Sequence, residues 1–159
     1  MKIAGTGHRP KYCPCKYRVN DPWLIDLKTR LNDYLGIWLK VEPIIVRTGM
    51  AIGWDTWLAE VALEMNIELH AYVPFPNQHI KWPTESQNKY KEILDSATKI
   101  NYTSQNYHPK VFLDRDLEMI TGVEKVLSLL NPIVTSGGTY YTVKEAEKKN
   151  IEIVNFWID

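Results

Sequence analysis

Three glycine-containing segments have the composition of loops that hold phosphate groups. They are Gly5 to Arg9, Thr48 to Asp55 and Ser136 to Thr139, and each follows a predicted strand. Glycine lets the backbone turn sharply and approach a ligand closely. The free N–H groups at the start of a following helix then attract an anion. Turn geometry alone explains one such loop, but three loops at one edge of a sheet favour a phosphate site.

Two charged side chains beside these loops could contact the same ligand. Arg9 follows the first loop and can grip a phosphate through two nitrogens, although a solvated loop arginine is the alternative. Asp55 falls in the first turn of a predicted helix, where the helix dipole favours its ionised form. We expect Asp55 to be an ionised carboxylate that either stabilises its helix or accepts hydrogen bonds from ribose hydroxyls.

The predicted helix over Pro109 to Gly122 places a charged pair among apolar residues. Its apolar stripe consists of Phe112, Leu113, Leu117 and Ile120. Arg115 and Asp116 fall on or beside that stripe, and charged groups on a buried face need partners. The pair could form a structural ion pair, or it could point into a ligand cleft, and we favour the cleft.

A proline-rich segment from Pro74 to Pro83 predicts a rigid loop that carries aromatic and amide side chains. Phe75, Gln78 and Trp82 could form a wall against which a nucleobase stacks. Aromatic residues after a strand more often belong to the core, so packing is the alternative for Phe75 and Trp82.

Composition limits the class of protein. The 19 basic and 19 acidic side chains cancel, whereas proteins that bind duplex DNA carry a basic excess. Nucleic acid is therefore disfavoured as the main partner.

The cysteines and histidines do not form a pattern that binds metal. Cys13 and Cys15 are one residue apart and the four histidines lack metal-ligand spacing, so we predict reduced thiols and no metal. Without a signal pattern or a membrane-length apolar run, we expect a cytoplasmic protein.

Apolar periodicity alternates between strands and helices along the whole chain. The predicted strands are Lys2 to Thr6, Ile44 to Val46, Ile67 to Val73, Lys99 to Thr103, Val126 to Leu130 and Ile151 to Trp157. Helices are predicted between them, the third over Thr84 to Ala97 and the last over Thr142 to Lys149. This alternation predicts one α/β domain over residues 1–159, a Rossmann-like doubly wound, mainly parallel sheet with helices on both faces.

Several motifs then resemble, in the same order, the YpsA-type branch of the SLOG superfamily. They are Gly7-His8-Arg9-Pro10, Gly49-Met50-Ala51-Ile52-Gly53-Trp54-Asp55-Thr56, Pro74-Phe75 through Gln78 to Trp82, Tyr90, Arg115 and Gly137-Gly138-Thr139. That superfamily also contains the DprA DNA-processing proteins and the LOG phosphoribohydrolases. The resemblance implies a Rossmann-like protein that binds a nucleotide or a nucleotide-derived signal.

Loop chemistry and resemblance together predict one ligand-binding set. It consists of Gly7, His8, Arg9, Gly49, Met50, Ala51, Gly53, Asp55, Pro74, Phe75, Gln78, Trp82, Arg115, Asp116, Ser136, Gly137, Gly138 and Thr139. The expected ligand is a nucleotide or an ADP-ribose-type molecule. The oligomeric state stays open, a homo-oligomer included.

The chain departs from the related sequences at three places. The branch usually has asparagine where this chain has Asp116, and it lacks the pair Cys13 and Cys15. The LOG enzymes carry a catalytic glutamate at the position of Thr142. Without that carboxylate, glycosidic-bond cleavage loses its acid/base group.

Three functions follow, and we favour the first, a binding or sensing module with little or no catalysis. The alternative is a hydrolase that cleaves an N-glycosidic bond, with Asp55 or Asp116 replacing the missing glutamate. The weaker alternative is a DprA-like accessory to single-stranded DNA, against which zero net charge and the lack of a long basic run argue.

Overall fold

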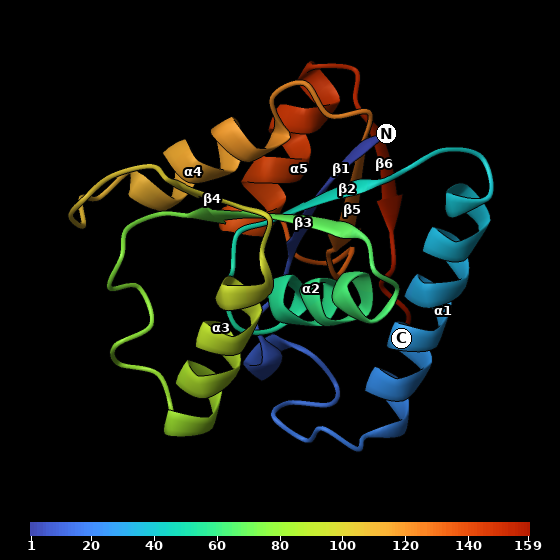
Figure 1. The fold of residues 1–159 in the computed structure, drawn as a ribbon, viewed down its shortest axis with the longest axis horizontal. Helices are drawn as coiled ribbons and strands as arrows, with labels where there is room; N and C mark the ends of the chain where they lie inside the picture. The colour runs from blue at the N-terminus through green and yellow to red at the C-terminus, as the bar shows by residue number, and fades with distance from the viewer.

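The computed structural model describes residues 1–159, and its centre is a six-stranded parallel sheet (Figure 1). The strands are β1 (Lys2–Gly7), β2 (Ile45–Thr48), β3 (Glu68–Val73), β4 (Lys99–Tyr102), β5 (Lys125–Leu129) and β6 (Glu152–Asn155). Their order is β4-β3-β2-β1-β5-β6, and every neighbouring pair is parallel. The chain therefore adds β2, β3 and β4 on one side of β1 and then returns to add β5 and β6 on the other side of β1.

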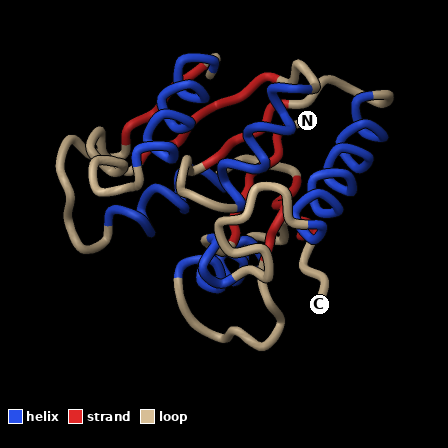
Figure 2. Tube along the Cα trace, turned by 90° about the horizontal axis from the view of Figure 1, so that it is seen from below, coloured by secondary structure: helices blue, strands red, loops and turns tan.

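Five α-helices cover the two faces of this sheet. They are α1 (Pro22–Leu39), α2 (Trp54–Glu64), α3 (Thr84–Ser96), α4 (Val111–Ile120) and α5 (Gly138–Lys148), and a short 3-10 turn, η1 (Pro10–Tyr12), follows β1. Helices α1, α2 and α3 lie on one face, and α4 and α5 lie on the other (Figures 1 and 2). The predicted doubly wound architecture is confirmed.

Helix α1 shows how local sequence determines an element. The Asp21 carboxylate accepts a hydrogen bond from the Trp23 N–H at 2.9 Å, and Pro22 occupies the first helical position. Both features stabilise a helix start. The residues that α1 buries in the hydrophobic core are Leu24, Leu27, Leu31 and Leu35. Their spacing of three or four residues places them on one face of the helix.

Two helices differ from the prediction. Helix α5 begins at Gly138, four residues before the predicted Thr142, because its first turn carries no buried apolar residue and periodicity cannot detect it. Helix α4 buries Val111, Met119 and Ile120 together with a charged pair, whereas Phe112, Leu113 and Leu117 are only half-buried. The predicted apolar stripe of α4 is therefore confirmed at Ile120 and only partly buried at its other three positions. None of the helices is both long and apolar enough to cross a membrane, and the cytoplasmic location stays a prediction.

Candidate functional site

A pocket of about 580 Å³ lies where the strand order reverses, beyond the carboxyl ends of β1 and β5. In open α/β sheets, ligands bind at this switch point. Two of its walls are the segments Gly5 to Arg9 and Ser136 to Thr139. The other lining residues are Lys11, Tyr12, Ala51, Asp55, Phe112, Arg115, Asp116 and Val134. Two of the three glycine loops that the sequence places at one edge of the sheet thus meet in one pocket, and the third, Thr48 to Asp55, contributes Ala51 and Asp55 to it.

The start of α5 presents backbone donors to this pocket. Gly137 precedes the helix with φ of 92°, a conformation that favours glycine, and no side chain caps the helix. The N–H groups of Gly138 and Thr139 donate to no acceptor within the chain. A Cβ built on Gly137 or Gly138 would meet no atom within 4 Å. Uncapped N–H groups and the helix dipole together favour an anion here.

The loop after β1 contributes two cations and one neutral histidine. His8 Nε2 accepts a hydrogen bond from the Asn131 N–H at 3.0 Å, so the imidazole proton lies on Nδ1. Burial lowers the pKa of His8, which keeps this ring uncharged at neutral pH. Neither Arg9 nor Lys11 forms a salt bridge. His8 therefore positions the loop after β5, while Arg9 and Lys11 supply positive charge at the pocket.

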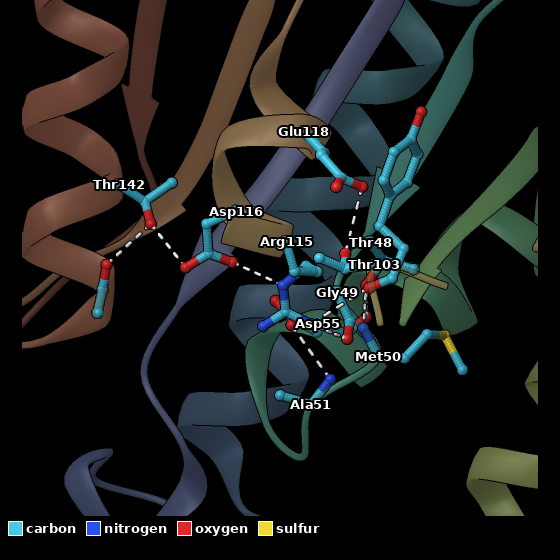
Figure 3. Close-up of polar contacts among 12 residues, drawn as sticks. Thr48, Gly49, Met50, Ala51, Asp55, Thr103, Arg115, Asp116, Glu118 and Thr142 are labelled. Atoms are coloured by element: carbon cyan, nitrogen blue, oxygen red, sulfur yellow. Dashed lines mark hydrogen bonds and ion pairs between the residues drawn. The ribbon is translucent and has the colours of Figure 1, made fainter. Parts of the chain in front are cut away.

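The charged pair of α4, Arg115 and Asp116, lines the pocket and also bonds to neighbouring segments of the chain (Figure 3). Arg115 Nε donates to Asp116 Oδ1 at 2.7 Å, and its Nη1 donates to the carbonyl oxygens of Gly49 and Tyr72. The Thr142 hydroxyl lies 2.9 Å from the other Asp116 oxygen. The two alternatives from the sequence are therefore combined, because the ion pair is structural and both side chains also line the pocket.

Asp55 is a buried carboxyl group in the pocket wall. Its Oδ2 accepts a hydrogen bond from the Ala51 N–H at 3.2 Å. Burial raises the pKa of Asp55 to about 6, although the charge of Arg115 and the Ala51 N–H act in the opposite direction. Burial therefore shifts the pKa of Asp55 upward, opposite to the direction that the helix dipole favours, and the carboxyl group is still mostly ionised at pH 7.

Three predicted residues of the loop after β2 support the pocket without lining it. A Cβ on Gly49 would lie 2.6 Å from Arg115 Nη1 and 2.8 Å from Asp55 Oδ2. Gly53 has φ of 99°, and its Cβ would lie 2.6 Å from the carbonyl oxygen of His8. Met50 is buried in the core. These residues hold the loop against α4 and the segment after β1.

The four predicted residues of the proline-rich loop also lie outside the pocket lining. Phe75 packs edge-on against Tyr107 and Phe112, with 5.9 Å between ring centroids in each pair. Trp82 packs edge-on against Tyr90 at 5.5 Å. Gln78 Nε2 donates to the Met50 carbonyl oxygen at 3.3 Å, and Pro74 is buried. Phe75 and Trp82 are therefore packing residues, which is the alternative that the sequence analysis stated for them.

Six residues that line the pocket are absent from the predicted ligand-binding set. They are Gly5, Thr6, Lys11, Tyr12, Phe112 and Val134. Lys11 and Tyr12 directly follow Arg9-Pro10, and this adjacency to the first motif is the signal that could have found them. Nearby, Cys13 and Cys15 are free and buried, and burial raises the pKa of Cys13 to about 12. No three His, Cys, Asp or Glu side chains gather into a set that could hold a metal ion.

Comparisons with known sequences show which family this chain belongs to. The model of the YspA SLOG family matches residues 3–157. A UPF0398 protein of Brevibacillus brevis is 31% identical over 94 residues, 56% of this chain and 50% of that protein. A UPF0398 protein of Bacillus cereus is 28% identical over 167 positions, 97% of this chain and 86% of that protein.

Solved structures show the same fold at low sequence identity. DNA processing protein A of Streptococcus pneumoniae has a TM-score of 0.66 at 12% identity, over 97% of this chain and 49% of that one. Its counterpart from Helicobacter pylori, a structure that describes single-stranded DNA binding, has a TM-score of 0.66 at 17% identity. There the match covers 98% of this chain and 64% of that one. The chain thus spans about half of the pneumococcal protein, and the prediction against nucleic acid gains no support.

Proposed function

The chain belongs to the YspA SLOG family, and from this premise we propose that it binds a phosphorylated, nucleotide-derived small molecule in the pocket beside α5. The observation that carries the proposal is the uncapped start of α5, whose free N–H groups line the same pocket as Arg9 and Lys11. Backbone donors and unpaired cations around one cavity suit a phosphate group.

The charge of the pocket supports the same ligand class. Arg9, Lys11 and Arg115 line it together with two acidic residues, Asp55 and Asp116. Because Arg115 and Asp116 neutralise each other, the remaining charged groups that line the pocket are two cations, Arg9 and Lys11, and one acidic group, Asp55. A phosphate monoester carries close to two negative charges at pH 7, which complements the two free cations.

The size and polarity of the pocket suit more than a bare phosphate ion. Its volume of about 580 Å³ lies in the range of small-molecule sites. Only four of its 17 lining residues are hydrophobic, so the ligand is mostly polar. Asp55 can accept hydrogen bonds from ribose hydroxyls, as acidic residues do in dinucleotide-binding folds.

Hydrolysis of an N-glycosidic bond is the second candidate function, and Asp55 is the residue that favours it. A carboxyl group with a pKa of about 6 can act as a general acid near neutral pH. Asp116 is a poor candidate because Arg115 and Thr142 engage both of its oxygens. Incubation with AMP, NAD and ADP-ribose, followed by chromatography for free base, tests this candidate. Base release that Asp55→Asn abolishes would favour the enzyme.

Single-stranded DNA binding is a third candidate, which a local run of cations favours. Arg9, Lys11, Lys16 and Arg18 lie within ten residues of sequence that contain no acidic residue. Binding through these cations would be strongly salt-dependent. Titration of a fluorescent oligothymidine at two salt concentrations separates this candidate from the small-molecule proposal.

A thermal-shift screen tests the main proposal. AMP, ADP, ATP, NAD, ADP-ribose and inorganic phosphate are each added to the full chain. A ligand at a hundredfold excess over its dissociation constant adds about 2.7 kcal/mol of stability, which raises the melting temperature. If neither the nucleotides nor inorganic phosphate moves the transition, the proposal is contradicted.

A further inference from the structure

Tyr12 is a large aromatic residue that lies at the pocket with most of its surface exposed. It lines the pocket and is 59% exposed. Two other tyrosines, Tyr17 and Tyr107, are exposed to a similar extent, but neither lines the pocket. The exposed position of Tyr12 therefore differs from theirs, because it places an aromatic ring beside the two free cations.

The backbone that carries Tyr12 is fixed although its ring is exposed. Its N–H donates to the Arg9 carbonyl oxygen at 3.0 Å, and the Cys13 N–H donates to the Pro10 carbonyl oxygen at 3.0 Å. Cys13 and Cys15, directly after the turn, are buried in the main hydrophobic core. A ring on a fixed backbone loses little conformational entropy when a ligand stacks on it.

The faces of the Tyr12 ring are not filled by other rings. Lys11 Nζ lies 4.8 Å from the ring centroid, over one face. The His8 ring lies 6.1 Å away and is tilted by 57°, so it does not stack on Tyr12. Phe112, the other lining residue with a large aromatic ring, already packs against Phe75 and Tyr107. Tyr12 therefore offers the available stacking surface.

We propose that Tyr12 is the residue on which a nucleobase of the ligand stacks, so that the pocket selects nucleotides over sugar phosphates. This inference rests on the proposed function, in which Arg9 and the start of α5 hold the phosphate. Every nucleobase has a flat π-face, and stacking on an aromatic side chain contributes to binding regardless of base identity. Lys11, over the ring, holds positive charge next to the base and phosphate.

The test compares AMP with ribose 5-phosphate by isothermal titration calorimetry, using the full chain and three variants. Tyr12→Leu removes the aromatic ring, Tyr12→Phe keeps it, and Tyr17→Leu removes a ring of equal exposure outside the pocket. We expect Tyr12→Leu to weaken AMP binding by about five- to a hundredfold, the range for loss of one stacked base. Ribose 5-phosphate binding should stay within about twofold, and the other two variants should bind AMP normally.

Three results would overturn the inference. If Tyr12→Leu binds AMP as well as the unmodified chain does, no base stacks on Tyr12, while phosphate binding itself stands. If a fourth variant, Phe112→Leu, weakens AMP binding selectively and Tyr12→Leu does not, the stacking residue is Phe112. If neither AMP nor ribose 5-phosphate binds the unmodified chain, the proposed function fails together with the inference. Circular dichroism of each variant shows that it is folded.

Discussion

Two glycine loops that look alike in sequence have opposite surroundings in the structure. The loop after β2 contains Gly49 and Gly53, and a Cβ at either would lie less than 3 Å from atoms of distant segments. The loop before α5 contains Gly137 and Gly138, and a Cβ at either would meet nothing within 4 Å. Atoms of other segments pack against the first loop, whereas the second loop leaves its backbone N–H groups accessible.

The difference teaches that glycine before a helix has two separate physical causes. At Gly49 and Gly53, absence of a side chain allows Arg115 and the segment after β1 to pack closely against the loop. At Gly138, absence of a side chain leaves space beside the helix start. We therefore expect substitutions in the first loop to lower stability and substitutions in the second to lower ligand affinity.

The largest loss of stability should come from Arg115, which holds the first loop in place. Arg115→Met removes the hydrogen bonds to Gly49 and Tyr72 and leaves Asp116 without its cation. Removing one partner of a buried ion pair costs about 3–5 kcal/mol. Urea denaturation measures the change, and Asp116→Asn is the milder control because its amide oxygen can still accept a hydrogen bond. A loss below about 1 kcal/mol for Arg115→Met would show that the pair is not needed for folding.

Gly53→Ala should have the next largest effect. Gly53 has φ of 99°, and the added Cβ would lie 2.6 Å from the backbone oxygen of His8. A strained backbone together with overpacking should destabilise the fold by about 2–4 kcal/mol. Gly36→Ala is the matched control, because its Cβ would meet only Met65 Cε at 3.7 Å. That control should be neutral or stabilise α1 by up to about 1 kcal/mol, and equal melting temperatures for the two variants would contradict the packing account.

Asp55 should give a smaller, pH-dependent effect. Its folded-state pKa of about 6 lies above the unfolded value of about 3.9, so the folded state retains this proton as the pH rises. Its contribution to stability is therefore full below about pH 4 and is lost as the pH rises through 6, with a magnitude up to about 3 kcal/mol. Denaturation of the unmodified chain and of Asp55→Asn from pH 4 to 7 should show a difference that changes over this window. A constant difference would contradict the burial of this carboxyl group.

The sequence predicted the order of the elements along the chain and that the loops after β1 and before α5 meet, because parallel strands place their carboxyl ends at one edge of the sheet. It could not predict which distant atoms pack against the loop after β2. The atoms that explain Gly49 belong to Arg115, 66 residues away, and this contact depends on how α4 lies on the sheet. The sequence likewise placed Arg115 and Asp116 on or beside the buried face of α4 but could not name Thr142 as a partner of Asp116, because that contact also depends on how α4 and α5 lie together. Tyr12 was missed because no glycine marks it.

Gly138→Val has the smallest expected effect on stability and tests the central claim most directly. The new Cβ enters space with no atom within 4 Å, so the free energy of unfolding should change by less than about 1 kcal/mol. The same side chain would block the N–H groups at the start of α5. Calorimetric titration with AMP of the unmodified chain, Gly138→Val and the Gly36→Ala control decides the matter. The account predicts that only Gly138→Val loses AMP binding while it remains folded, and normal AMP binding by a folded Gly138→Val would contradict it.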